Sequence, residues 1–235
     1  FREGIPDGWS VDGVGLREIT ARGDFVVSLN GNRAVDQILA GGLFTYALSP
    51  RLNGAVRTPY TSAFKNGHIS FLGCGGDFAA HRTVFDNAFL TEKQKFLAND
   101  RPHWTLLTTH HNQTRHRVYL EFATKTSNPN FPPRVGLGGV CSDEQIADPR
   151  SWFGLTQAVF HEAGHTPLNE LKPFDSLLKT RTPESLDELC GAYSAWLGQA
   201  ITAWAEDCAT DSQLELVQWL LDERLLTNAI QPGGS

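Results

Sequence analysis

Several features that mark other classes of protein are missing from this 235-residue sequence. No apolar run approaches the roughly 20 residues that a membrane-spanning helix needs. The N-terminus lacks the charged start and apolar stretch of a signal peptide. The formal net charge is −6 and the basic residues form no dense patch, which argues against binding to nucleic acid or to an anionic membrane. We therefore expect neither of these among its partners.

Methionine is also absent, even at position 1, so we expect a processed chain or an excised domain. The four cysteines, Cys74, Cys141, Cys190 and Cys208, show no CxxC spacing, which argues against a cysteine zinc site or a thioredoxin-like motif. Their even number predicts one or two disulfides in an exported chain. The glycosylation sequon at Asn112 fits a secreted or extracellular protein.

The residues that are present indicate a globular fold whose texture changes near residue 150. Before it, β-like runs predict strands at 24–29, 68–73, 104–109 and 117–124, and helical patterns occur at 34–43 and 91–100. After it, the periodicity predicts helices at about 152–166, 182–206 and 212–229, and a loop-like stretch at 126–139 lies between the halves. We predict a monomeric α+β protein with a β-rich subdomain at 1–150 and a helical subdomain at 151–235.

The segment FHEAGHTP, residues 160–167, holds two histidines four residues apart. If a helix runs to Thr166 and ends before Pro167, His161 and His165 lie on one face and could bind one zinc ion. Glu162 could then reach a metal-bound water and take its proton as a general base. The alternative is that these are ordinary surface residues of a helix.

HEAGH resembles the HExxH signature of zincin metallopeptidases, and the resemblance covers this short motif and its downstream context. It implies a zincin-like fold, with a mixed sheet and active-site helix in the N-terminal half and helices in the C-terminal half. It also implies one Zn²⁺ per chain and a metalloendopeptidase that cleaves a protein or peptide substrate. Leu168 and Leu171 do not fit the metzincin pattern, so a gluzincin, with a glutamate as third ligand, is the closer match.

Three acidic residues at the start of the 182–206 helix compete for the role of third ligand. Glu188 precedes the small residues Gly191 and Ala195 on one face, where another helix could approach closely, so we assign the metal to His161, His165 and Glu188. Glu184 is the rival and Asp187 a further alternative. Without a metal, all three would be an acidic helix N-terminus that favours the helix dipole.

Other interpretations remain open. HEAGH could be incidental in a toxin-like transferase or glycohydrolase, or the chain could be a zincin fold that binds a partner without cleaving it. A second histidine cluster, His110, His111 and His116, falls at the turn of a predicted hairpin. These side chains are either solvated, or serve as a transition-state donor or a second metal site.

Overall fold

The computed structural model describes residues 1, 4–17, 20–30, 33–62, 67–86, 88–108, 117–127, 144, 147–162, 164–165, 167, 177 and 183–222. Two compact units emerge from its internal contacts. The first, here called the sandwich unit, comprises Phe1–Val26 and Leu39–Pro167. The second, the helical unit, comprises Val27–Ile38 and Leu168–Ser235. The predicted domain boundary at residue 150 is not tested by this division and stays a prediction.

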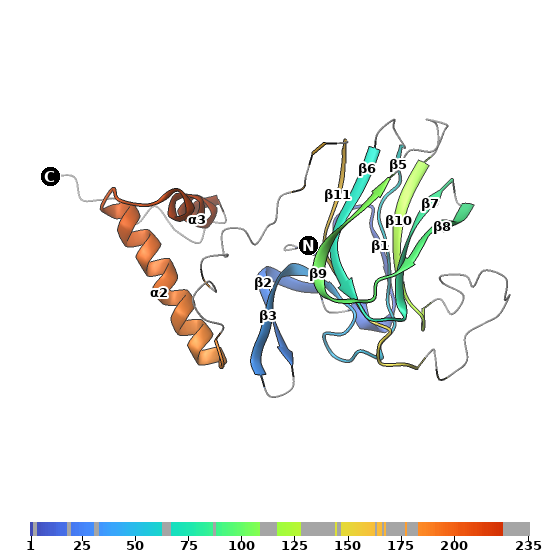
Figure 1. Cartoon of the computed structure of the whole chain (residues 1–235), viewed down its shortest axis with the longest axis horizontal. Helices are drawn as coiled ribbons and strands as arrows, with labels where there is room; N and C mark the ends of the chain where they lie inside the picture. The colour runs from blue at the N-terminus through green and yellow to red at the C-terminus, as the bar shows by residue number, and fades with distance from the viewer. Residues whose placement is uncertain are drawn as a thin grey trace. The chain divides into compact units, whose positions relative to one another are not determined.

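Two antiparallel sheets contain all the described strands (Figure 1). The six-stranded sheet has the order β1–β4–β10–β7–β8, with β5 beside β10. Its strands are β1 (Ser10–Asp12), β4 (Ala55–Arg57), β5 (Thr61–Ser62), β7 (Ala79–Phe85), β8 (Ala88–Phe96) and β10 (Arg117–Thr124). The five-stranded sheet has the order β2–β3–β11–β6–β9. Its strands are β2 (Thr20–Asn30), β3 (Arg33–Phe44), β6 (Gly67–Gly75), β9 (Asn99–Thr108) and β11 (Phe153–Glu162).

One apolar core joins the two sheets. Leu120 and Phe122 of β10 belong to the same buried cluster as Phe71 of β6 and Phe153 of β11. The rings of Phe71 and Phe122 lie 4.9 Å apart, edge to face. Since both sheets bury one face in a common core, the sandwich unit is a two-layer β-sandwich.

The predicted helix over 152–166 is wrong, because most of this segment is β11. Its register with β6 runs from Phe153↔Gly75 to Glu162↔Gly67, with a bulge between Leu155 and Gln157. After the bulge, Ala158 and Phe160 pack against the core, two residues apart as a strand requires. The apolar residues of a short segment fit a helix or a strand equally well, and pairing with β6 decides between them. The zincin-like fold with an active-site helix is therefore wrong.

Two further predicted helices are strands. Residues 34–43 lie in β3, and residues 91–100 span the end of β8 and the start of β9. At Gly42, near the end of β3, the chain lies so close to β11 that a Cβ would stand 2.5 Å from the Leu155 carbonyl oxygen. The strands predicted at 24–29, 68–73 and 117–124 are confirmed, as is 104–108 in β9.

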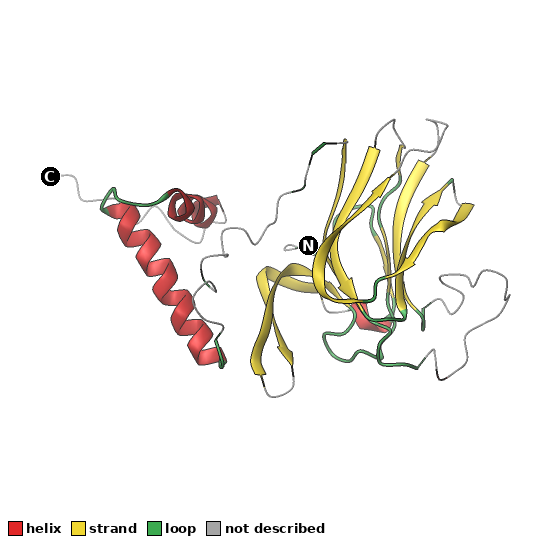
Figure 2. Cartoon of the chain, viewed as in Figure 1, coloured by secondary structure: helices red, strands yellow, loops and turns green. Residues whose placement is uncertain are grey.

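The helical unit contains α2 (Leu186–Ala205) and α3 (Asp211–Asp222). Ala200 of α2 shares a small core with Leu216, Val217 and Leu220 of α3. Both helices were predicted, and residues 223–229 of the second prediction lie outside the described residues. Figure 2 shows the resulting change from strands to helices after β11. Neither described helix combines the length and apolar character needed to cross a membrane.

The predicted disulfides are not found among the described cysteines. Cys74 is buried and unpaired, and Cys190 and Cys208 are exposed and unpaired. Cys141, the 128–139 part of the predicted loop, the sequon at Asn112 and the cluster of His110, His111 and His116 lie outside the described residues.

Candidate ligand-binding face

The outer face of the five-stranded sheet gathers polar and apolar side chains. Because side chains alternate along a strand, residues beside the core positions Ile69 and Phe71 point away from the core. Pairing places Trp104 and Gln157 on either side of Leu72, and Leu106 and Val159 on either side of Ser70. We call this surface the outer face, formed by His68, Ser70, Leu72, Trp104, Leu106, Gln157, Val159 and His161.

A pocket of about 270 Å³ opens on the outer face. It is lined by His68, Ser70, Trp104, Leu106, His161, Gly164, His165 and Pro167. Three neighbouring strands supply the first five of these residues, and the chain leaving β11 supplies the others. A site held by paired strands is preorganised, since its side chains are fixed relative to one another before a ligand arrives.

His161 is engaged at both ring nitrogens. Its Nδ1 lies 2.9 Å from the Glu162 backbone oxygen, and its Nε2 lies 2.8 Å from Ser70 Oγ. A carbonyl oxygen can only accept, so Nδ1 donates to the Glu162 oxygen, and in the tautomer with its proton on Nδ1 alone the Ser70 hydroxyl donates to Nε2. Both ring nitrogens are engaged, with none free for a metal in this geometry. Ser70 Oγ retains lone pairs that can accept from a ligand.

Two further polar atoms of the outer face lack a partner. His68 Nδ1 and Gln157 Oε1 are shielded from solvent and accept or donate no hydrogen bond among the described residues. The ring of His68 lies 5.7 Å from that of His161, tilted by 34°. A buried polar atom without a partner is costly, so a ligand hydroxyl that reached either atom would gain a strong interaction.

Apolar surface lies beside these polar atoms. Leu106 of β9, an edge strand of the five-stranded sheet, is 59% exposed, and Trp104 is half-buried next to it. The solvent-facing positions of a sheet are mostly polar, so exposed apolar side chains there indicate a surface that binds a ligand or partner. The outer face thus offers an aromatic ring, an aliphatic side chain and unsatisfied polar atoms within one surface.

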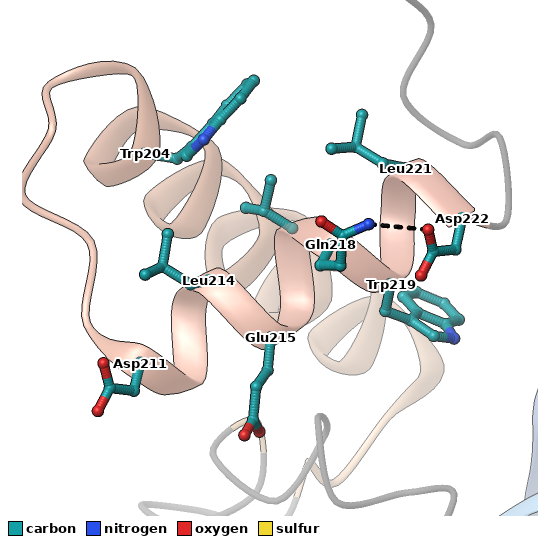
Figure 3. Close-up of a pocket in the computed structure, with 9 residues that line it drawn as sticks. Trp204, Asp211, Leu214, Glu215, Gln218, Trp219, Leu221 and Asp222 are labelled. Atoms are coloured by element: carbon teal, nitrogen blue, oxygen red, sulfur yellow. Dashed lines mark hydrogen bonds between the residues drawn. The ribbon is translucent and has the colours of Figure 1, made fainter.

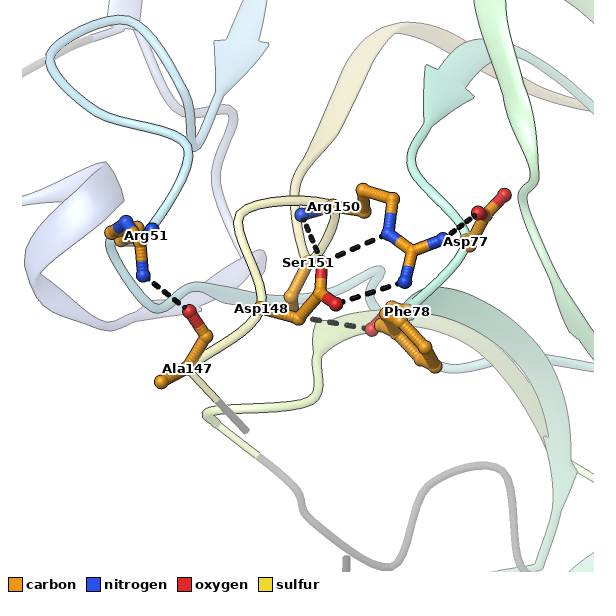
Figure 4. A network of polar contacts seen from close by, with 7 residues as sticks. All are labelled: Arg51, Asp77, Phe78, Ala147, Asp148, Arg150 and Ser151. Carbon is orange, nitrogen blue, oxygen red and sulfur yellow. Dashed lines mark hydrogen bonds and ion pairs between the residues drawn. The ribbon is translucent and has the colours of Figure 1, made fainter. Parts of the chain in front are cut away.

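A polar network positions β11 at its start (Figure 4). The guanidinium of Arg150 contacts Asp148 at 2.9 Å and Asp77, in the β6–β7 turn, at 2.9 Å. Ser151 Oγ donates to the Phe78 carbonyl oxygen at 3.1 Å and accepts from Lys125 N at 2.8 Å. These contacts hold the chain before β11 against the end of β6, and so support the register that aligns His161 with His68.

The two histidines of the predicted zinc site do not lie on a helix. His161 and Glu162 end β11, and His165 follows Gly164, whose positive φ of 87° turns the chain. His161 and His165 line the same pocket, but they do not lie on one face of a helix. Within the described residues, no group of three or more His, Cys, Asp or Glu side chains is placed to hold a metal. The zincin resemblance and the zinc metalloendopeptidase activity, both of which require the HExxH helix, are therefore wrong.

The proposed third ligand has a structural role in the helical unit. Ser185 caps α2 by accepting from Glu188 N at 3.1 Å, and the Glu188 carboxylate accepts from Glu184 N at 2.9 Å. The sequence SLDE, with serine and glutamate three residues apart, is a capping-box pattern that could have revealed this role. The ligand set of His161, His165 and Glu188, and the zinc ion itself, stay predictions.

Sequence comparisons place this chain in no known family: no family model matches, and no curated protein matches. Solved structures with a similar arrangement include one in complex with β-1,4-galactotriose. It is 9% identical in sequence, the match covers 68% of this chain and 92% of the other, and the TM-score is 0.33. A cleaved adhesin domain of Lys-gingipain from Porphyromonas gingivalis has 13% identity, coverage of 69% and 96%, and a TM-score of 0.35. A xylan-binding module has 13% identity, coverage of 68% and 94%, and a TM-score of 0.28.

These similarities are too distant to assign a function. The strand pairing and the common core define the sandwich unit as a two-sheet antiparallel β-sandwich. A helical pair follows it in the chain.

Proposed function

We propose that this chain is a binding module that holds a neutral saccharide on the outer face of its five-stranded sheet. The observation that carries the proposal is the placement of Trp104 and Leu106 beside three polar atoms with unused hydrogen-bonding capacity. A sugar ring is complementary to both features, since it has an apolar C–H face and a rim of hydroxyl groups. Ligand sites commonly combine an apolar lining with a few well-placed polar groups in this way.

The polar atoms suit hydroxyl groups better than charged groups. Ser70 Oγ and Gln157 Oε1 can accept hydrogen bonds, and the contact with His161 fixes the orientation of Ser70. The indole of Trp104 supplies a large rigid surface at a small cost in side-chain entropy. We therefore propose a neutral sugar chain rather than a peptide as ligand, met outside the cell.

Hydrolysis of the bound sugar is not supported by the pocket. Most glycoside hydrolases flank the scissile bond with two carboxylic acids. The described residues that line the pocket include no aspartate or glutamate. This arrangement agrees with the interpretation that HEAGH is incidental. It does not support the glycohydrolase activity that was part of the same interpretation.

Affinity electrophoresis tests the proposal directly. The full chain is run through gels that contain soluble neutral galactan, xylan, mannan or glucan, and we expect at least one of them to retard it. Trp104→Ala should weaken that affinity at least tenfold, which is about 1.4 kcal/mol. Gln157→Ala should weaken it less, because one hydrogen bond is lost and the apolar platform remains.

Leu48 offers a matched control for the platform. It is 73% exposed and does not line the pocket, so Leu48→Ala should leave retardation unchanged while Leu106→Ala reduces it. Retardation by a polysaccharide that persists in full in Trp104→Ala would rule out the outer face as its site. Failure of every neutral polysaccharide to retard the chain would remove the proposed ligand class.

A further inference from the structure

The two helices and their flanking residues, 183–222, carry charge of one sign. Residues 183–222 contain eight of the chain's 26 acidic residues, and none of its 20 basic residues or eight histidines. The rest of the chain has a small basic excess, so the net charge of −6 arises in this stretch. Asymmetry of this kind indicates a surface that attracts a partner of opposite charge.

Acidic residues also occupy the ends of the helices where they are least favoured. Glu206 is the C-cap of α2 and is followed by Asp207, and Asp222 ends α3. Neither helix has a basic residue in its last turn. The C-terminal end of a helix carries a partial negative charge that cations stabilise, so both ends would gain from a cation brought by a partner.

An apolar groove lies along α3, with Trp204 of α2 in its lining (Figure 3). It has a volume of about 540 Å³. Leu214, Val217 and Leu221 of α3 line it at helical spacing, with Trp204 from the end of α2. In Figure 3, Leu214 and Leu221 extend toward the side on which Trp204 lies, and Glu215 extends the other way. Trp204 is 37% exposed and Leu214 46% exposed.

We propose that this groove docks a basic amphipathic helix of another protein. Leu214 and Leu221 are separated by about 10 Å along α3, which matches two turns of a partner helix. The partner's apolar residues would contact Trp204, Leu214 and Leu221, as in other helix-in-groove interfaces. Its lysine or arginine side chains would meet Asp211 and Asp222, which line the groove, and Glu206, two residues after Trp204. These charges would speed association at low salt.

A synthetic peptide of about 14 residues, with leucines at helical spacing and lysines elsewhere, serves as the probe. We expect the full chain to bind this peptide saturably in fluorescence anisotropy, with an affinity that falls as salt is added. A peptide in which glutamates replace the lysines should not bind. Trp204→Ala should weaken binding at least fivefold, whereas Trp104→Ala in the sandwich unit should leave it unchanged.

The double variant Glu206→Gln with Asp222→Asn separates a docking surface from loss of folding. It removes acids from the C-terminal ends of the helices, where they oppose the dipole, so the helices should be at least as stable. Peptide affinity should nevertheless fall at least fivefold. Asp7→Asn with Glu162→Gln is the charge-matched control, because both residues are exposed and lie in the sandwich unit.

Two results would overturn the docking proposal. Equal weakening by the control and the groove variant would mean that the peptide senses only the total charge. If the full chain does not bind the peptide, the groove is covered by the chain itself or by a second copy. Sedimentation would distinguish the monomer from the dimer. Either result leaves the saccharide proposal standing, since that rests on the outer face.

Discussion

His81 shows how burial controls a single ionisable residue. It is 3% exposed, and its ring lies 4.9 Å from that of Phe71 and 6.2 Å from that of Phe122. Burial lowers the pKa of His81 to about 4 from an ordinary value of 6.5, with smaller contributions from the charges of Lys95 and His103. The folded protein therefore keeps this imidazole neutral under conditions in which the unfolded chain protonates it.

The first prediction follows from the sign of this pKa shift. Between pH 6.5 and pH 4 the unfolded chain binds a proton that the folded chain does not, so the free energy of unfolding falls as the pH is lowered. The loss amounts to about 3 kcal/mol over this window and is absent above it. In His81→Leu this loss should disappear. Urea unfolding at several pH values measures the difference, and the exposed His165→Gln variant should keep the native dependence.

A buried ion pair is the other residue-scale feature. Glu121 is 1% exposed on β10, and Arg82 on the paired strand β7 is 7% exposed. Both Nε and Nη2 of Arg82 donate to Glu121 Oε2, at 3.2 and 2.8 Å. Arg57 Nε lies 3.4 Å from the same oxygen.

The second prediction compares this pair with an exposed one. Arg82→Met leaves a buried carboxylate with weaker compensation and should cost about 3 kcal/mol of stability. Arg150→Met removes a partner of Asp77 in a pair whose side chains are both more than half exposed, and should cost much less than Arg82→Met, because water screens an exposed pair. Equilibrium unfolding of both variants gives the comparison. Similar losses in the two would show that Glu121 reaches water after Arg82 is removed.

At the scale of elements, glycine has opposite effects in helices and strands. A Cβ added at Gly191 or Gly198 of α2 would meet no atom of the described residues within 4 Å. The sequence suggested that another helix packs closely against the face of α2 that carries Gly191. No described residue makes such a contact at Gly191 or Gly198. A Cβ at Gly42 of β3 would instead collide with the Leu155 carbonyl oxygen of β11 at 2.5 Å.

The third prediction uses this contrast. Gly191→Ala and Gly198→Ala should each stabilise α2 by about 0.5–1 kcal/mol, because alanine loses less conformational entropy in a helix. Gly42→Ala should destabilise the sandwich unit, because the β3 and β11 backbones must separate to admit the methyl group. Urea unfolding followed by far-ultraviolet circular dichroism distinguishes the effects. A helix weakened by both alanines would show that the glycines have a contact role.

At the scale of the whole molecule, saccharide binding is expected to be independent of metal. The ring nitrogens of His161 are hydrogen-bonded to Ser70 and to the Glu162 backbone. These contacts order the outer face without an ion. The fourth prediction is that EDTA leaves retardation by the polysaccharide unchanged. Added zinc, if it bound His161, would have to break the Ser70 bond and should weaken retardation. A chelator that abolished binding would show that an ion is part of the site.

Local elements could be predicted from the sequence where their residue pattern had one interpretation. The strands around HISFLG and RVYLEFAT and the helices α2 and α3 follow from alternation, helical spacing and capping residues. The Ser185 and Glu188 pattern belongs to the same class of local signal, although a ligand role for Glu188 competed with it. Such features depend on residues within one or two turns, so no distant contact is needed to recognise them.

The conformation of HEAGH and the location of the outer face depend on tertiary contacts. The segment 153–162 has enough apolar residues for a buried helix or a strand, and its pairing with β6, between 78 and 95 residues earlier in the chain, selects the strand. Trp104, Ser70 and His161 are likewise distant in sequence, and strand register alone brings them to one surface. A local pattern carries no information about register between distant strands, because register is set by the shared core and by backbone hydrogen bonds that form only in the assembled sheets.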